Sequence, residues 1–431
     1  MANDFPGLRF IPYPGASAEA MPMAALAGDL VFYGGGVAAH PDHGVPEGIQ
    51  AFEGYPNHWS QINRELDHIY GIMGQVLADA GSDMRHVMKL NAFHVGEADV
   101  YEALRMRPEI FGDQPPPSTL VLEPELSVRG LRVAVDGVAL KVSSGHARQA
   151  LTLSTESAPM PPHQKIWGKT IYSKAVKGGG FIFTSGRTNN IIGGANDDRL
   201  RRHKDFPYQH DHAEVSCRLV LDYLRDVLAS FQADFAHVVK AEIHLNDMTQ
   251  IAAIERVWRD AFGADPPARV FIPSTFPTPY TTLEIELIAL DPEGPWDRQP
   301  IPLPRPARER VCEPRAVKAG PYVFFSGLCA TDFIDGLASQ ARVNPGLPFH
   351  EDRVHKEMAY IAQVIESAGT GLVPLRCRFM TPDLRRFGPF LEAWKRSMSG
   401  AAMPMTTFRT PGPLPIPDTA FQLDLVAWAG C

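Results

Sequence analysis

The sequence predicts an α+β fold in which one unit, a β-sheet carrying two helices on one face, occurs three times. Each third of the chain opens with an apolar strand that ends in small residues, at 30–35, 181–186 and 322–327. Each third also closes on a largely alternating strand, at 131–140, 283–290 and 421–428. The same elements recurring in one order indicate internal triplication.

The elements between these strands follow from the spacing of apolar residues. In the first third, a helix is expected from about Trp59 to Ala80, because apolar side chains recur there every three or four residues. The other two thirds repeat this spacing from Val215 to Leu228 and from Val354 to Ile365. A β-rich segment follows each helix, and a shorter second helix then leads to a proline-marked turn. The β-rich segments lie at 87–95, 238–245 and 373–380.

Two segments interrupt the pattern and suggest where the units join. Residues 143–163 are rich in Ser, Thr and Pro, and residues 291–306 are rich in proline, which disfavours helix and central strand. We interpret both as surface tethers. The predicted domains are therefore 1–146, 147–298 and 299–431.

Composition limits the classes of function. The 431 residues are 45% hydrophobic and 21% charged, as in globular proteins, and the net charge of −8 argues against a nucleic-acid or anionic-membrane partner. No long apolar run or signal-like N-terminus is present, so a cytoplasmic location is expected. The five cysteines are odd in number and lack paired close spacing. They suit reduced thiols better than disulfides or a zinc site.

The middle third carries four short motifs. They are Ile-Tyr-Ser-Lys-Ala-Val at 171–176, Phe-Thr-Ser-Gly at 183–186, Pro-Ala-Arg at 267–269 and Leu-Glu-Ile-Glu-Leu-Ile-Ala at 283–289. In order and spacing they resemble the RidA/YjgF family of enamine and imine deaminases. The resemblance implies a chorismate mutase-like fold and homotrimers with a ligand cleft at each subunit interface. Three such repeats in one chain imply an intramolecular pseudo-trimer.

The resemblance also implies roles for particular residues. Arg269 would bind the carboxylate of an imine or enamine acid through two parallel hydrogen bonds. Glu284 would move protons between the attacking water and the departing ammonia. Ser185 and the backbone of Gly186 would anchor polar atoms of the substrate, and Tyr172 would supply a hydroxyl or a wall. Arg269 and Glu284 are the predicted catalytic pair, and no metal or organic cofactor is required.

The first and last thirds differ from the middle third at the positions that carry these roles. The arginine position is Ser118 and Thr406, the glutamate position Ala134 and Gln422, the serine position Gly34 and Ser326, and the tyrosine position Met21 and Glu313. We therefore expect degenerate sites there, although Arg129, Arg132 and Arg409 offer material for a different anion site. A second acidic position persists in all three thirds and is interpreted as structural: Asp136, Glu286 and Asp424.

The middle third also carries a charged loop at 187–212. It is interpreted either as a solvated loop or as a lid whose arginines bind a second carboxylate, as a 2-aminomuconate would present. His210 and His212 are two residues apart and would share a face on a strand, as metal ligands do, but two ligands do not make a metal site.

The predicted function is hydrolysis of an enamine or imine carboxylic acid, like 2-aminoacrylate or 2-aminomuconate, to a keto acid and ammonia. The partner is thus a small carboxylic acid, and further homo-oligomerisation of the pseudo-trimer is left open. Two alternatives remain: a non-deaminating hydrolase of the chorismatase or barbiturase type, and a metabolite-binding regulator. Whether Arg269 and Glu284 face one cleft, and which neighbouring repeat completes it, also stays open.

Overall fold

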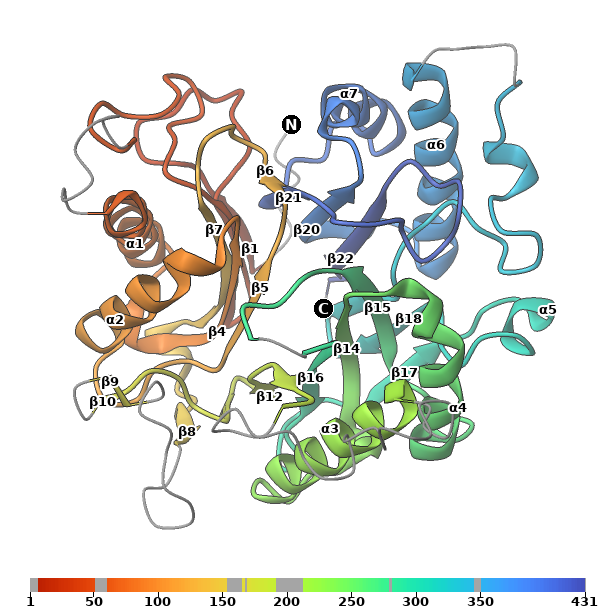
Figure 1. The fold of residues 1–431 in the computed structure, drawn as a ribbon, viewed down its shortest axis with the longest axis horizontal. Coiled ribbons are helices and arrows are strands. Elements are labelled where there is room, and N and C mark those ends of the chain that lie inside the picture. Colours follow the sequence, from red (N-terminus) through yellow and green to blue (C-terminus); the bar gives the residue numbers. More distant parts are fainter. Residues whose placement is uncertain are drawn as a thin grey trace, which may run out of the picture.

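The computed structural model describes residues 7–50, 60–152, 165–166, 169–190, 212–278, 281–344 and 350–430. They form a mixed α+β fold with three large sheets that share one strand order. Figure 1 shows the three thirds of the chain side by side around the centre, from red-orange through green to blue.

The first sheet has the order β1-β2-β3-β7-β4-β5. Pairing is antiparallel except between β4 and β5, which are parallel. The strands are β1 (Leu8–Ile11), β2 (Ala24–Ala27), β3 (Leu30–Gly36), β4 (Val87–His94), β5 (Ser118–Leu122) and β7 (Val133–Leu140).

The second sheet has the corresponding order β8-β11-β12-β16-β14-β15, and β13 adds to β16. Its parallel pair is β14 and β15. The strands are β8 (Gln149–Leu151), β11 (Ala175–Gly178), β12 (Phe181–Thr184), β13 (Arg187–Thr188), β14 (Val238–Leu245), β15 (Ala268–Pro273) and β16 (Leu283–Leu290). A separate two-stranded sheet pairs β9 (Lys165–Ile166) with β10 (Lys169–Thr170).

The third sheet repeats the order as β17-β18-β19-β22-β20-β21, with β20 and β21 parallel. Its edge is extended by β6 (Glu125–Leu126), a strand from the first third of the chain. The other strands are β17 (Arg298–Ile301), β18 (Ala316–Ala319), β19 (Tyr322–Phe325), β20 (Val373–Thr381), β21 (Met405–Arg409) and β22 (Gln422–Trp428).

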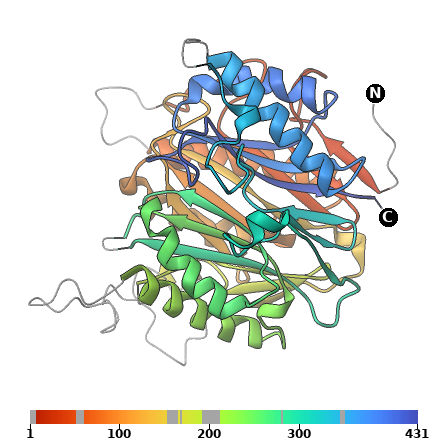
Figure 2. The same cartoon turned by 90° about the vertical axis from the view of Figure 1, so that its right-hand side faces the viewer.

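Two long helices accompany each of the three large sheets and lie on the outside of the molecule (Figure 1), as Figure 2 shows from the side for the second and third thirds. They are α1 (Gln61–Asp79), α2 (Val100–Phe111), α3 (His212–Ala229), α4 (Ile251–Phe262), α6 (His350–Ala368) and α7 (Phe387–Ser397), and α5 (Arg305–Arg308) is a single turn. Short 3₁₀ turns are η1 (Met84–His86), η2 (Glu97–Asp99), η3 (Val142–Ser144), η5 (Phe235–His237), η6 (Met248–Gln250), η7 (Ser339–Ala341) and η8 (Leu384–Arg386). None of the described helices combines the length and apolar character needed to cross a bilayer.

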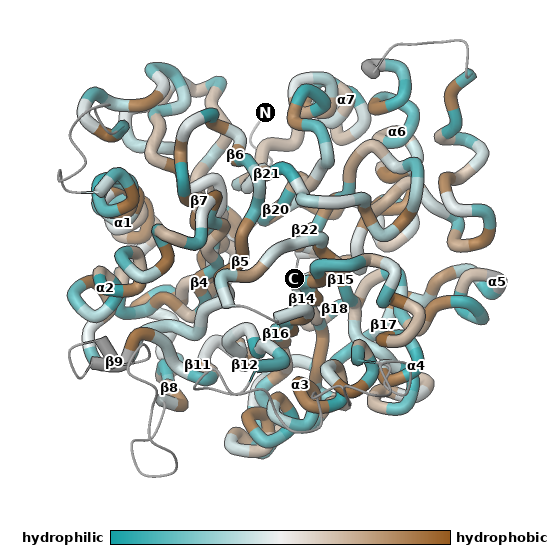
Figure 3. The backbone as a smooth tube through the Cα atoms, in the orientation of Figure 1, coloured by the Kyte–Doolittle hydropathy of each residue, from teal (hydrophilic) through white to brown (hydrophobic). Residues whose placement is uncertain are grey.

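The helices pack on their sheets because one side of each is apolar. In α1, Leu66, Ile69 and Met73 are buried in a cluster with strands of the first sheet. Figure 3 shows apolar and hydrophilic stretches alternating along such helices. A further apolar cluster joins the opposite faces of all three sheets, where the Tyr322 ring contacts Phe181 (5.4 Å between centroids) and Trp428 (5.3 Å).

The observed elements match most of the sequence-based expectations. The middle strand of the second third was expected at 238–245, where β14 lies, and the helix expected from Trp59 to Ala80 is α1. The tether interpretation was incomplete, because β8 and β17 form in those segments as edge strands. Pro300 fits β17 because an edge strand tolerates a missing N–H donor. The described cysteines are buried free thiols: Cys217, Cys312, Cys329 and Cys377.

Candidate active site

The three sheets meet at contacts of one kind. At each, the N–H of a glycine at the end of an opening strand donates to a residue near the start of the parallel edge strand of the preceding sheet. The pairs are Gly186 with the Ser118 carbonyl (3.1 Å), Gly327 with the Arg269 carbonyl (2.8 Å) and Gly35 with Thr406 Oγ1 (3.1 Å). We call these contacts boundary 1–2, boundary 2–3 and boundary 3–1.

The predicted catalytic pair is divided between two boundaries. β14 lies between β15 and β16, and Arg269 on β15 pairs with Ala241 while Glu284 on β16 pairs with His244. Because side chains alternate along a strand and 241 and 244 differ by an odd number, Arg269 and Glu284 project from opposite faces of the sheet. Arg269 and Glu284 therefore do not share one site.

Arg269 lies at boundary 2–3 and is already neutralised. The residue is 2% exposed, and its Nε is 2.8 Å from an oxygen of Glu313, which occupies the tyrosine position of the last third. A second ion pair joins it to Glu255, and the ring of Phe271 lies 4.9 Å from the guanidinium carbon. Two carboxylates thus hold this arginine, so a substrate carboxylate would have to compete with both.

A pocket of about 500 Å³ opens at boundary 2–3. Arg269, Glu255 and Glu313 line it, together with Gln422 at the glutamate position of the last third. The side-chain amide of Gln422 donates to the Phe271 carbonyl (3.0 Å). An amide does not move protons near neutral pH, so this pocket lacks the proton-transferring group at the position where the family resemblance expects one.

Glu284 lies at boundary 1–2. It is 4% exposed, and its carboxylate packs so closely on Gly186 that a β-carbon there would overlap it. The same β-carbon would come within 2.6 Å of Thr119 Oγ1, on β5 of the first sheet. A side chain at position 186 would therefore have to displace Glu284 or Thr119, so glycine fits the close approach of Glu284 and a neighbouring sheet.

The protonation of Glu284 is set by its surroundings. Burial raises its pKa to about 8, the nearby Glu286 carboxyl raises it as well, and Lys89 and Arg187 oppose this shift. Burial and Glu242 likewise raise the pKa of Glu286 to about 7. A carboxyl group that titrates near neutral pH can both donate and accept a proton during one reaction cycle.

Tyr172 and Ser185 also lie at boundary 1–2. The Ser185 hydroxyl accepts from the Ser118 N–H (2.8 Å) and donates to the Ser173 carbonyl (2.7 Å). These bonds fix the junction between the two sheets. Tyr172 is half-buried, and its pKa is raised by burial, Tyr223 and Glu284, and lowered by Arg187 and Arg107. Its neutral hydroxyl thus lies within the electrostatic reach of Glu284 and two cations.

Two arginines that the sequence analysis did not single out lie at boundary 1–2. Arg187 on β13 is half-buried, with its guanidinium carbon 4.3 Å from the Tyr223 ring centroid. Arg107 on α2 is 3% exposed; burial lowers its pKa, and Tyr70 and Tyr172 act in the opposite direction. At this boundary, Ser118 stands at the position where the middle third has an arginine. The positive charge is supplied instead by Arg187 on β13 and Arg107 on α2.

Boundary 3–1 is built from uncharged groups at the corresponding positions. Ala134 is in an apolar cluster with Met380 and Phe408. The arginines considered as replacements are each paired with a carboxylate: Arg129 with Glu125 (3.6 Å), Arg132 with Asp99 (2.9 Å) and Arg409 with Glu125 (3.4 Å). They therefore do not rebuild an anion site in this structure.

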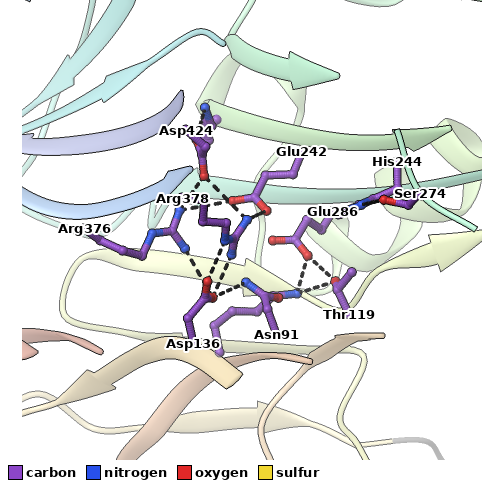
Figure 4. A network of polar contacts seen from close by, with 12 residues as sticks. Asn91, Thr119, Asp136, Glu242, His244, Ser274, Glu286, Arg376, Arg378 and Asp424 are labelled. Atoms are coloured by element: carbon purple, nitrogen blue, oxygen red, sulfur yellow. Dashed lines mark hydrogen bonds and ion pairs between the residues drawn. The ribbon is translucent and has the colours of Figure 1, made fainter. Parts of the chain in front are cut away.

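The second acidic positions, Asp136, Glu286 and Asp424, lie in a buried network at the centre of the molecule (Figure 4). Arg378 binds Asp136 through two nitrogens (2.6 and 2.8 Å) and also pairs with Glu242. Further ion pairs join Arg376 to Asp424 (2.8 Å), Lys240 to Asp424 (2.7 Å) and Lys89 to Glu286 (2.9 Å). These acids serve packing between sheets, in agreement with their structural interpretation.

One cluster in this network has the residue types of a metal site. Glu242, His244 and Glu286 place one ligand atom each within 4.8 Å of one another. Both carboxylates are, however, already bound to cations, Glu242 to Arg378 and Glu286 to Lys89. The positive charges make this cluster unfavourable for a metal ion. Of the two histidines considered as metal ligands, His210 lies outside the described residues.

The middle third of the chain is similar in sequence to known proteins. The sequence family described as endoribonuclease L-PSP matches residues 163–291. A RutC family protein of Pyrococcus horikoshii is 28% identical over 141 residues, which are 31% of this chain and 93% of the relative. One of Pyrococcus abyssi is 27% identical over 141 residues, 31% of this chain and 92% of the relative. Residues 163–291 belong to the RidA/YjgF family.

The solved structures similar to this chain include a YjgF family protein and a chorismatase. A YjgF family member from Neisseria meningitidis is 23% identical, with 34% of this chain and 98% of that chain covered and a TM-score of 0.24. A chorismatase is 13% identical, with 64% of this chain and 78% of that chain covered and a TM-score of 0.39.

The RidA/YjgF segment thus contributes residues to two boundaries. Its Tyr172, Ser185, Gly186 and Glu284 come together at boundary 1–2, whereas its Arg269 lies at boundary 2–3. Arg107 was missed because it lies outside the matched segment. A signal existed: the eighth residue of the second helix is tryptophan in the other two thirds.

Proposed function

We propose that this chain hydrolyses an enamine or imine carboxylic acid to a keto acid and ammonia, and that boundary 1–2 is the working site. The observation that carries the proposal is the burial of the Glu284 carboxyl against Gly186, which raises the pKa of Glu284 to about 8. The family of residues 163–291 is in line with this chemistry. Tyr172 and Arg187 supply a hydroxyl and a cation beside the carboxyl.

In the proposed reaction, protonated Glu284 donates its proton to the imine nitrogen while water bonds to the imine carbon. The resulting carboxylate takes a proton from that water, which leaves a carbinolamine. Glu284 then protonates the amine as the C–N bond breaks and removes the proton of the new hydroxyl. Imine and water have become keto acid and ammonia, and Glu284 is again protonated.

We further propose that the three thirds, 1–146, 147–298 and 299–431, form an intramolecular pseudo-trimer. This arrangement is supported by equivalent hydrogen bonds, in which a buried lysine of one third donates to a backbone carbonyl of the next third. The ammonium of Lys89 donates to the Thr184 carbonyl (2.8 Å), and Lys240 donates in the same way to the Phe325 carbonyl. The recurrence of the glycine contact at all three boundaries supports closure of the ring.

The proposal is tested by ammonia release from 2-aminoacrylate generated in situ, with the 2-aminomuconate reaction measured in parallel. We expect ammonia to form faster than in enzyme-free controls. Substrate loss without ammonia would point to a non-deaminating hydrolase. Binding without turnover would instead point to a regulator, and either result would rule out the proposed reaction.

The raised pKa of Glu284 predicts a pH dependence. Turnover that needs the protonated carboxyl should fall as the pH rises through about 8. The free energy of unfolding should also fall over this pH range. Because the folded-state pKa exceeds the usual value of 4.5, the stabilisation by Glu284 is complete below pH 4.5 and is lost as the pH rises to about 8. Glu284→Gln should flatten this slope in urea unfolding measured across that window, and an unchanged slope would contradict the assignment.

A further inference from the structure

Arg107 is a buried cation without a carboxylate partner. Arg107 interacts with the Tyr70 hydroxyl, and no acidic side chain of the described residues pairs with it. The other buried arginines of the described chain differ, because Arg269, Arg376 and Arg378 all bind carboxylates. An uncompensated buried charge strongly destabilises a fold, so its presence points to an anion that the described residues do not supply.

The position of Arg107 shows how the first third differs from the second. Arg107 is the eighth residue of α2, and Trp258 is the eighth residue of α4. In the second third, the guanidinium of the strand residue Arg269 lies 5.5 Å from the Trp258 ring. In the first third, the strand residue is Ser118 and the helix residue is the arginine. The guanidinium is thus on a strand in the second third and on a helix in the first third.

The surroundings of Arg107 connect it to the site at boundary 1–2. Arg107 and Glu284 both act electrostatically on the Tyr172 hydroxyl, in opposite directions. The N–H of Ser118, at the start of β5, donates to Ser185, next to the glycine that supports Glu284. A small acid held here would present its carboxylate to Arg107 and its reacting carbon to Glu284.

We propose that Arg107 binds the carboxylate of the substrate at boundary 1–2, in place of the strand arginine that the first third lacks. The inference deepens the proposed function and rests on it for the identity of the substrate, a 2-imino or 2-oxo monocarboxylate. A planar guanidinium suits this ligand because it offers two parallel hydrogen bonds to a carboxylate.

The test is calorimetric titration of the full chain with 2-oxobutyrate and with its uncharged amide, 2-oxobutanamide. Arg107→Met should weaken 2-oxobutyrate binding roughly 10- to 100-fold and leave amide binding unchanged, because the lost contacts are charge-assisted. Arg105→Met is the matched control: Arg105 lies on the same helix but is exposed and paired with Glu102 (3.2 Å). It should bind 2-oxobutyrate like the wild type.

The outcomes separate this inference from the proposed function. Equal 2-oxobutyrate binding by wild type and Arg107→Met, or equal loss of acid and amide, would overturn the role of Arg107 even in an active deaminase. Selective loss of acid binding would support it even if the wild type released no ammonia. If Arg107→Met does not fold, Arg107→Trp, the residue found in α4 and α7, replaces it with the same expectations.

Discussion

Glu284→Gln is expected to reduce ammonia release by roughly 10²- to 10⁴-fold, the usual contribution of a proton-transferring side chain. The amide has nearly the shape of the protonated carboxyl but does not donate and accept protons in turn. Burial keeps Glu284 largely protonated at neutral pH, so the variant should fold normally. The measurement is the initial rate of ammonia formation at matched concentrations of folded protein.

The control for this variant is Glu293→Gln, which alters an exposed carboxylate of the same third. It should retain the wild-type rate. A Glu284→Gln rate within a few-fold of the control would remove Glu284 from the reaction. Retained 2-oxobutyrate binding by Glu284→Gln would show that the loss lies in proton transfer.

Arg378→Met is expected to lower the free energy of unfolding by about 3–5 kcal/mol, the typical effect of removing one partner of a buried ion pair. Arg378 is fully buried and binds both Asp136 and Glu242, which belong to the first and second sheets. Without the arginine, two buried carboxylates lose their nearest countercharge at the centre of the molecule. Urea unfolding followed by circular dichroism would measure the change.

Arg225→Met provides the comparison for Arg378→Met. Arg225 pairs with Asp222 (2.7 Å) on the exposed side of α3, where an ion pair contributes at most about 1 kcal/mol. Equal urea midpoints for the two variants would mean that the central network is not needed for the sheets to stay together.

Local patterning was enough to predict the opening, middle and closing strands and the two helices of each third. Apolar alternation predicted β16 at 283–290, and helical spacing predicted α1 to within a few residues. The pairing of β6 with β21 was not predictable in this way, because it joins residues 125–126 to the last third and leaves no local periodicity. Likewise, β8 and β17 are short edge strands in proline- or serine-rich segments, where composition favours loops.

The sequence singled out residues that lie at the boundaries, but it did not predict how they are arranged. Arg269 and Glu284 look like one pair in the linear motif, yet the register of β15 and β16 on β14 sends them to opposite faces. That register depends on tertiary pairing. Arg107 could be found from the sequence only by comparing the second helices of the three thirds, because the first has arginine at the position where the other two have tryptophan. The charged run Asp197–Lys204, interpreted as a solvated loop or lid, lies outside the described residues.

The most direct test of the central claim compares ammonia release from 2-aminoacrylate by Arg269→Met and Glu284→Gln at equal folded concentration. Boundary 1–2 as the working site predicts that Arg269→Met keeps a rate within a few-fold of the wild type, whereas Glu284→Gln loses it. Glu313→Gln, at the same boundary as Arg269, gives a second reading if Arg269→Met folds poorly. Loss of turnover in the boundary 2–3 variants, with turnover retained in Glu284→Gln, would contradict the claim and move the reaction to the pocket around Arg269.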